Sequence, residues 1–363
     1  MSTREPALQK LLDQAAVDVD SGRLPSCQLA LAKHGELVAL ESFGTATSDS
    51  RYVVFSVTKA LTAALAWQVI GEGLLSDQTR VASLIPEFDV EGKRDVTLEH
   101  LLTHTAGFPN APIRSLDGAT PEGRARRFAQ WRLDWAPGSR TQYHPVAAHW
   151  VVADLVEKAT GTDYRQALRE RVLDPLGLSV QLGTTHDIEP LVIVGEGAPQ
   201  ELEVAVAVDD TALQFNDPAV RAVGVPGAGA VSGAADIALF YQALLHDPSG
   251  LWDPAVLADA TSRVRFDHLD PFTQVPANRT LGLTVAGGDG KAMMREFGKA
   301  CSPRAFGASG LGGQIAWADP ATGVSFCYLT NGLDADLVAS YLRSSRLSTL
   351  AARWGNAREA TRS

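Results

Sequence analysis

Ser56 and Lys59 are the residues of this sequence whose types and spacing best suit nucleophilic chemistry. They stand where a short β-branched run, residues 52–55, gives way to an apolar helix. A serine suits the N-cap or first turn of a helix, because its side-chain oxygen can accept from the free backbone N–H groups there. Lys59 follows one helical turn later on the same face. Its amine could take the hydroxyl proton while the helix end stabilises an oxyanion.

The spacing Ser-x-x-Lys is loose, and it has an ordinary structural alternative. In that alternative Ser56 is a plain helix cap and Lys59 is a solvated helix residue. The helix that follows, residues 60–70, is almost uniformly apolar, which predicts that it is buried. A lysine at the head of a buried helix is costly unless it has partners. The context therefore favours a built site over a surface charge.

Two further segments could complete such a site. Tyr143 lies in a loop fixed by Pro137 and Gly138, just before an apolar helix over residues 144–160. A tyrosine near a lysine ammonium can have a depressed pKa and shuttle protons, although a half-buried structural tyrosine is the alternative. Residues 306–313 are small and glycine-rich, so a substrate could approach backbone N–H groups that stabilise an oxyanion. The alternative there is a plain turn or bulge.

Other site types find less support in the sequence. His100 and His104 could suggest a metal pair, but no third ligand is apparent. The glycine-rich residues 224–233 lack the Gly-Lys-Ser/Thr ending of a phosphate loop. We therefore expect no metal and no cofactor. The cysteines show neither metal spacing nor a disulfide framework, and we expect reduced, non-catalytic thiols at Cys27, Cys301 and Cys327.

Composition bounds the class of protein and its partners. The 363 residues are 45% hydrophobic and 20% charged, which is typical of a globular protein with a sizeable core. The formal net charge of −10 argues against nucleic acid or an anionic membrane as the main partner. No apolar leader or membrane-length run is present, so we expect a cytoplasmic location. A homo-oligomer stays possible.

The order of elements is α/β, then helical, then α/β. We expect an α/β (α+β) fold, in which an antiparallel sheet is flanked by terminal helices and carries an inserted all-helical lobe. The α/β lobe would comprise residues 1–107 and 216–363, and the helical lobe residues 108–215. Ser232 is expected to cap a helix over residues 234–245. Strands are expected at residues 27–32, 37–43, 281–286, 314–318 and 324–330, and terminal helices at 7–19 and 334–350.

These motifs are similar, in order and spacing, to those of the serine β-lactamase and penicillin-binding-protein superfamily. Within it, the chain most resembles the class C β-lactamase-like branch that includes the family VIII carboxylesterases. The resemblance covers most of the chain, and it is specific only because the motifs occur together. They are Phe-Ser-Val-Thr-Lys at 55–59, Leu-Leu-Thr-His-Thr-Ala-Gly-Phe at 101–108, Tyr143, Asp-Pro-Leu-Gly-Leu at 174–178, Ala-Gly-Ala-Val-Ser at 228–232 and Gly-Leu-Gly-Gly at 310–313.

The resemblance implies a role for each matched residue. Ser56 would be the acylated nucleophile, and Lys59 and Tyr143 the acid/base pair. Residues 308–310 align with the family's Lys-Thr-Gly strand motif, which makes the backbone N–H groups of Ser56 and Leu311 the expected oxyanion hole. The expected substrate-binding residues are Ser309, Gly310, His144 and Phe108.

Two positions depart from the family's pattern. Its β-lactamases carry Tyr-x-Asn, but the third residue here is Pro145, which offers no side-chain amide to a substrate carbonyl. The lysine of Lys-Thr-Gly is Ala308 here. The positive charge that would bind the carboxylate of a penicillin or a peptidoglycan stem is therefore missing. Both departures favour a small intracellular ester or acyl substrate.

The leading hypothesis is a cytoplasmic serine carboxylesterase that works through an acyl-enzyme. Open alternatives on the same fold are an acyltransferase, a weak β-lactamase, and an amidase or D-amino-acid peptidase. A non-catalytic binding protein would also fit the losses at positions 145 and 308. The helical region would shape the acyl pocket, with four aromatic residues that either line it or belong to the core: Phe108, Trp131, Trp135 and Trp150.

Overall fold

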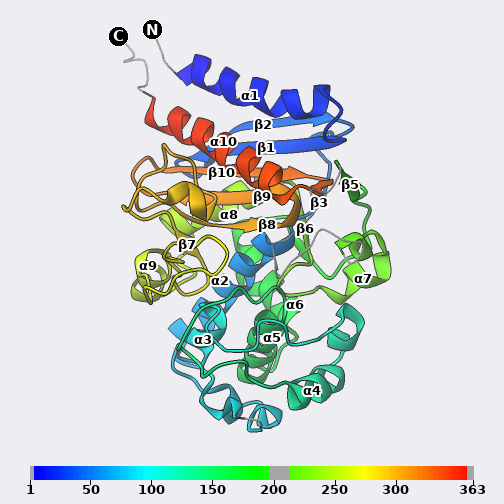
Figure 1. Cartoon of the computed structure of the whole chain (residues 1–363), viewed down its shortest axis with the longest axis vertical. Helices are drawn as coiled ribbons and strands as arrows, with labels where there is room; N and C mark the ends of the chain where they lie inside the picture. The colour runs from blue at the N-terminus through cyan, green and yellow to red at the C-terminus, as the bar shows by residue number, and fades with distance from the viewer. Residues whose placement is uncertain (1–3, 91, 196–211, 358–363) are drawn as a thin grey trace.

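The two ends of the chain meet in one antiparallel sheet. The computed structural model describes residues 4–90, 92–195 and 212–357. Its largest sheet has six strands in the order β2-β1-β10-β9-β8-β7 (Figure 1). β1 pairs with β10, which places Cys27 opposite Thr330. The strands are β1 (Ser26–Lys33), β2 (Glu36–Gly44), β7 (Thr284–Val285), β8 (Phe306–Gly310), β9 (Gln314–Asp319) and β10 (Val324–Thr330).

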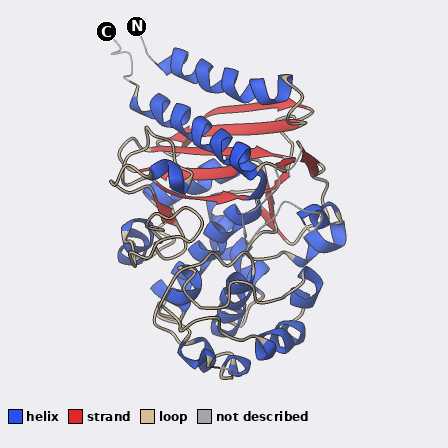
Figure 2. Ribbon diagram, in the orientation of Figure 1, coloured by secondary structure: helices blue, strands red, loops and turns tan. Residues whose placement is uncertain are grey.

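Helices cover both faces of this sheet (Figure 2). The terminal helices α1 (Arg4–Asp20) and α10 (Leu337–Asn356) pack against each other on one face. α8 (Ala234–His246) packs on β1, β9 and β10 from the other face. The predicted architecture of an antiparallel sheet between helices is confirmed.

Side-chain size differs between the two faces of the sheet. Successive strand residues point to opposite faces, and the inner strands are buried on both, so their apolar runs are continuous. Leu29 and Trp317 belong to the core formed with α1 and α10, whereas Ala30 and Ala316 belong to the core shared with α8. The small residues on the second face let α8 approach the sheet closely.

α2 (Thr58–Gly71) links the sheet to the helical part of the molecule, as Figure 1 shows. Its residues from Thr58 to Val69 are all buried, which confirms the burial predicted from its apolar sequence. The helix packs on α5 (Ala147–Thr160) and α9 (Pro254–Ser262). Indole hydrogen bonds fix it further: Trp67 Nε1 donates to Leu281 O at 2.7 Å, and Trp252 Nε1 donates to Ala64 O at 2.8 Å.

The middle of the chain is mainly helical. It contains α4 (Pro121–Gln130), α5 and α6 (Tyr164–Leu168). α3 (Leu98–Leu102), which precedes the expected helical lobe in the sequence, also packs against α5. The chosen lobe boundaries stay a prediction, and residues 196–211 of this interval lie outside the described residues.

The interval expected to be all-helical also contains two short strands. β4 (Gln181–Leu182) pairs with β6 (Ala230–Ser232), which in turn pairs with β3 (Tyr52–Val53). β5 (Val192–Val194) runs parallel to β11 (Gly332–Asp334), near α7 (Pro218–Val223) in Figure 1. These segments are too short and too weakly alternating for their sequence to have indicated strands.

The predicted cap of α8 is wrong by one residue. Ser232 is the last residue of β6, and the N-cap of α8 is Gly233, which forms no side-chain capping bond. Ser232 Oγ donates to Gly233 O at 2.9 Å. Strand pairing with Tyr52 therefore holds Ser232 in the sheet, which a capping pattern in the sequence does not reveal.

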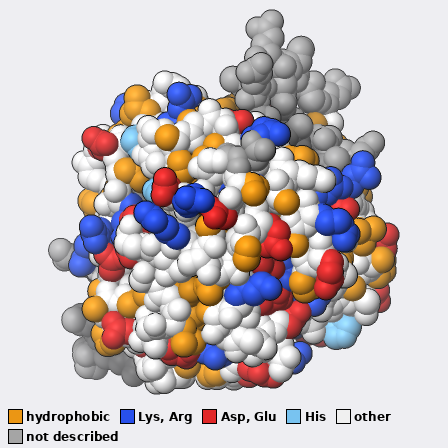
Figure 3. All heavy atoms as spheres, turned by 90° about the horizontal axis from the view of Figure 1, so that it is seen from below, with side chains coloured by type: hydrophobic (Ala, Val, Ile, Leu, Met, Phe, Trp, Pro, Cys, Tyr) orange, Lys and Arg blue, Asp and Glu red, His pale blue; other side chains and the backbone are white. Residues whose placement is uncertain are grey.

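The surface is of mixed charge. On the face that Figure 3 shows from below, acidic and basic side chains lie side by side. Among the described residues, no helix combines the length and the apolar character that crossing a bilayer requires.

A buried ion-pair group joins α4 to α5. Arg124 is 1% exposed, and its Nε donates to Asp154 Oδ1 at 2.7 Å while its Nη2 bonds the Glu157 carboxylate. Removing one member of a buried pair leaves uncompensated charge.

We expect Arg124→Met to lower the free energy of unfolding by about 3 kcal/mol in urea denaturation. Arg94→Met, which breaks the exposed pair with Asp89, is the control and should cause no measurable change. Equal stability of the two variants would contradict the prediction.

Candidate active site

Ser56 lies in a turn that is fixed by a strand before it and a helix after it. Val54 N donates to Ala230 O at 2.9 Å, which extends the pairing of β3 with β6. A 3-10 turn over Phe55–Val57 then leads into α2. Phe55 has a φ of +43°, which is uncommon for a non-glycine residue, and its buried ring packs edge-on against Phe215. Backbone strain held by packing is typical of functional sites, and here it lies directly before Ser56.

The hydroxyl of Ser56 does not cap α2, so the simple capping alternative is wrong. The N-cap of α2 is Val57, without a side-chain capping bond. Ser56 Oγ instead accepts hydrogen bonds from Lys59 Nζ at 3.0 Å and from Tyr143 OH at 2.6 Å. The structure thus brings together the three residues predicted to carry the chemistry.

Lys59 is buried, with an exposed fraction of 4%, which excludes the alternative of a solvated lysine. Besides Ser56 Oγ, its Nζ donates to Pro145 O and to Gly227 O, each at 2.7 Å. Burial lowers the pKa of Lys59 from its ordinary value, and the nearby charge of Arg279 acts in the same direction, while Tyr143 opposes both. The neutral amine is therefore more accessible than in an exposed lysine.

The partners of Lys59 determine where a neutral amine would point. A carbonyl oxygen can only accept, so Pro145 O and Gly227 O would each retain one N–H of the neutral amine. The nitrogen lone pair is then directed at the third partner, Ser56 Oγ. This arrangement suits removal of the hydroxyl proton by Lys59.

Tyr143 is held by aromatic and cationic neighbours. The His104 ring centroid lies 4.7 Å from that of Tyr143, and Lys59 Nζ lies 5.0 Å from the Tyr143 centroid. The guanidinium carbon of Arg279 lies 5.7 Å from the same centroid. His104 adopts a φ of +61°, and its Nδ1 accepts from His144 N at 3.2 Å. The tyrosine hydroxyl is therefore aimed at Ser56 by a packed ring and a fixed loop.

His144 and Phe108 lie behind the site in the buried interior. They are 0% and 1% exposed. His144 Nδ1 bonds Gln142 O at 2.7 Å and its Nε2 accepts from Phe108 N at 3.2 Å, which fixes the neutral tautomer. Burial lowers the pKa of His144 to about 4, in agreement with that tautomer. Both residues support the Tyr143 loop, and a direct contact with substrate stays a prediction.

The aromatic residues considered for an acyl pocket belong mainly to the core. Phe108 and Trp131 stack with centroids 5.4 Å apart, and Phe88 packs edge-on against both. Trp150 is 1% exposed and packs edge-on against Tyr164. For Phe108, Trp131 and Trp150 the core alternative is the one that the geometry supports.

The described histidines do not form a metal centre. His100 Nδ1 accepts from Thr97 N at 3.1 Å, while His104 lies against Tyr143, so the pair diverges. Within residues 4–90, 92–195 and 212–357, no three His, Cys, Asp or Glu side chains are grouped to hold a metal ion. Burial also holds the pKa of His104 and of His149 well below the ordinary value, so both rings are neutral. The free thiols are Cys27, Cys301 and Cys327.

The end of β8 lies directly against the turn that carries Ser56. A Cβ on Gly310 would come within 2.7 Å of Val54 O and 3.2 Å of Phe55 Cβ, so only glycine fits there. Ser309 and Leu311 are the chain neighbours of Gly310, so their backbones lie near this turn. This placement is compatible with the predicted oxyanion donors, the backbone N–H groups of Ser56 and Leu311, and with substrate contacts by Ser309 and Gly310, which stay predictions.

Two charged residues at the site were missed by sequence analysis. Arg279 lies over the Tyr143 ring, and Glu296 Oε1 accepts from Ser309 Oγ at 2.8 Å. Neither belongs to a catalytic motif, and both lie in irregular segments, so no pattern in the sequence indicates their place in the site. The site therefore contains a cation other than Lys59, although Ala308 supplies none.

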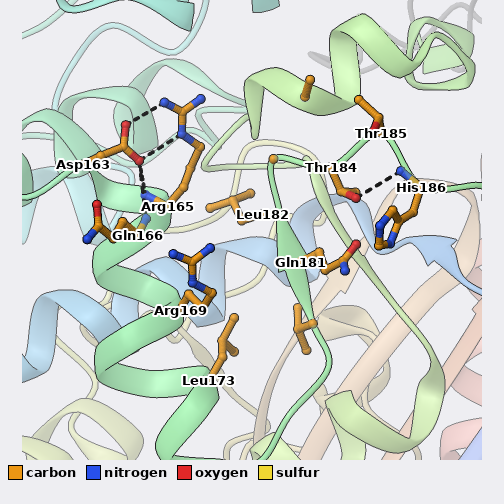
Figure 4. Close-up of a pocket in the computed structure, with 13 residues that line it drawn as sticks. Asp163, Arg165, Gln166, Arg169, Leu173, Gln181, Leu182, Thr184, Thr185 and His186 are labelled. Carbon is orange, nitrogen blue, oxygen red and sulfur yellow. Dashed lines mark hydrogen bonds and ion pairs between the residues drawn. The ribbon is translucent and has the colours of Figure 1, made fainter.

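A pocket of about 580 Å³ lies elsewhere, between the α6 segment and β4 (Figure 4). Its lining includes Arg165, Arg169 and His186 but none of the residues predicted to react. Arg165 is already paired with Asp163 and donates to Val223 O. The candidate active site stays at Ser56, because the predicted nucleophile and the two predicted proton-transfer residues are hydrogen-bonded to one another there.

The chain is similar to known proteins over most of its length. An esterase/beta-lactamase, LipL of Mycobacterium tuberculosis, is 28% identical over 80% of this chain and 72% of its own length. A putative D-alanyl-D-alanine carboxypeptidase of Escherichia coli is 26% identical over 86% of this chain and 79% of its own length. The crystal structure of a family VIII carboxylesterase superposes with a TM-score of 0.75 at 25% identity, over 96% of this chain and 98% of that one. The Beta-lactamase family model matches residues 8–349, and the chain is a serine hydrolase that belongs to this family.

Proposed function

We propose that this chain is a carboxylesterase that hydrolyses a small ester through an acyl-enzyme on Ser56. The observation that carries the proposal is the position of Lys59 Nζ, which lies between two backbone carbonyls and the Ser56 hydroxyl. An esterase/beta-lactamase among the relatives and a family VIII carboxylesterase among the structural neighbours support it. The cytoplasmic location stays a prediction, as does a homo-oligomer.

We infer a sequence of proton transfers from these contacts. Neutral Lys59 takes the proton of Ser56 Oγ as that oxygen attacks the acyl carbonyl carbon. Tyr143, 2.6 Å from Oγ, gives its phenolic proton to the departing alkoxide, and Lys59 returns a proton to the phenolate. Water then attacks the acyl-enzyme with the same groups acting in reverse. Backbone N–H groups of Ser56 and Leu311 would stabilise the oxyanion in both steps.

Two residues support an ester over a β-lactam or a cell-wall peptide. Ala308 provides no charge on β8 for a substrate carboxylate. Pro145 has no side-chain amide, and its carbonyl is occupied by Lys59. Acyl transfer, β-lactam hydrolysis and peptidase activity are the alternatives that the first experiment separates.

We expect Ser56→Ala to abolish hydrolysis of p-nitrophenyl butyrate. Among the described residues, Ser56 Oγ is the acceptor that both Lys59 Nζ and Tyr143 OH reach, so the variant has no nucleophile next to the proton-transfer groups. Intact-protein mass spectrometry should show an acyl adduct on the wild-type protein and none on the variant. A parallel incubation with benzylpenicillin should show no rapid adduct formation and release. Full esterase activity in Ser56→Ala would refute the mechanism, and fast β-lactam turnover would refute the ester assignment. Product that increases with added alcohol would indicate acyl transfer.

Lys59 should control the acidic side of the pH profile. Its pKa is lowered by burial, and only the neutral amine can act as base, so kcat/KM should rise as pH rises through the pKa of Lys59.

Lys59→Arg places a group that stays protonated at the same point, and we expect about 10³-fold lower kcat/KM at every pH. Lys158→Arg, on the partly exposed end of α5, is the matched control. A Lys59→Arg variant within about tenfold of wild type would exclude Lys59 as the base.

A further inference from the structure

We propose that Glu296 and Ser309 form a substrate subsite beside Ser56 that favours esters carrying a cationic ammonium group near the acyl carbonyl. This inference rests on the proposed ester hydrolysis and specifies its substrate class. It starts from a carboxylate and a hydroxyl that the proton-transfer steps do not use.

Glu296 is held towards β8 by a strained backbone. It ends the 3-10 turn Ala292–Arg295 with a φ of +64°, in the left-handed region that non-glycine residues rarely adopt. Glu296 N donates to Met293 O at 3.1 Å. The next residue back, Arg295, is anchored by its ion pair with Asp289 and by donation to Ala286 O. A glutamate kept in this conformation by its surroundings suggests a functional constraint.

The proposed subsite adjoins the end of β8 that packs on the turn before Ser56. Ser309 Oγ donates to Glu296 Oε1 at 2.8 Å. Gly310 follows Ser309 and packs against Val54 and Phe55, which immediately precede Ser56. A substrate acylating Ser56 would therefore have part of its structure beside Ser309 and the Glu296 carboxylate.

The charged groups that act on Glu296 do not pair with its carboxylate. Arg279 is the cation that acts on it, but Arg279 donates to Thr284 Oγ1 at 2.6 Å and lies over Tyr143. Tyr341, from α10, faces Glu296 and donates its hydroxyl to Met293 O. Within the part of the chain that the structure describes, Glu296 forms no ion pair.

The hydrogen bond also sets the polarity of Ser309. Because its proton is donated to Glu296, the oxygen presents lone pairs to any other partner. An ionised carboxylate and an accepting hydroxyl together attract a cationic or donating group and repel a carboxylate. Ala308, the preceding residue of β8, adds no charge to oppose this.

Ionisation of Glu296 falls in the neutral range. Burial raises its pKa to about 7, while the hydrogen bond from Ser309 and the charge of Arg279 oppose the rise. Below that pH the protonated subsite is uncharged, and above it the subsite is an anion. Preference for a cationic substrate should therefore increase with pH.

The test compares two p-nitrophenyl esters of equal shape. One carries γ-(trimethylammonio)butyrate, and the other its uncharged carbon isostere with a tert-butyl group. The ratio of their kcat/KM values cancels ionisations that both reactions share. We expect the ratio for the wild-type enzyme to favour the cation and to rise about tenfold from about pH 6 to about pH 8. Glu296→Gln should have a lower ratio that does not change with pH.

Two variants make the assignment specific. Ser309→Ala removes the hydrogen bond that lowers the pKa of Glu296, so the rise in the ratio should move to higher pH. Glu122→Gln, on the exposed start of α4, should behave as wild type. A flat wild-type ratio, or a Glu296→Gln ratio that still rises, would overturn the subsite alone. Hydrolysis of neither ester, without a Ser56 adduct, would overturn the proposed function and the subsite with it.

Discussion

The site depends on one buried nitrogen, Lys59 Nζ, and on the carbonyl oxygens that hold it. Burying an ammonium group is costly unless its protons are satisfied, and each of the partners of Nζ comes from a different part of the chain. Ser56 belongs to the turn before α2, Pro145 to the loop before α5, and Gly227 to the loop before β6. The nitrogen therefore joins three segments, and correct packing of all three is required to place the base.

Neighbouring polar residues of α2 strengthen this junction. Thr62 Oγ1 donates to Pro226 O at 2.6 Å, and Thr58 Oγ1 accepts from Ala230 N at 3.1 Å. The loop before β6 is thus attached along one side of the helix, while Gly310 of β8 packs on the turn that precedes it. The candidate nucleophile is held on elements that share one hydrophobic core.

The electrostatic environment follows from the same burial. His104, His144 and His149 surround the Tyr143 loop as neutral rings, because burial lowers the pKa of each. They add packing without adding charge. Among the residues that the structure describes, ionisable groups around the site include Lys59, Arg279 and Glu296, and the low dielectric of such a site strengthens the effect of each on proton transfer and on substrate choice.

The sequence by itself determined most of the long elements and the candidate reacting residues. Apolar periodicity located the terminal helices, the buried helix α2 and the strands of the main sheet other than β8, and motif spacing singled out Ser56, Lys59 and Tyr143 as candidates. These features are local, or repeat at fixed intervals, so a linear pattern records them. The short strands β4 and β5 and the true start of α8 escaped it, because pairing with distant strands decides them.

Tertiary structure alone decided what surrounds the reacting groups. Pro145 suggested only a lost amide, yet its carbonyl is one of the oxygens that direct Lys59 at Ser56. His144 and Phe108 matched a motif, yet they are buried behind the Tyr143 loop. Arg279 and Glu296 belong to no catalytic motif and reach the site from irregular segments. Backbone carbonyls and long side chains act through positions in space, and these depend on how segments far apart in the chain pack together.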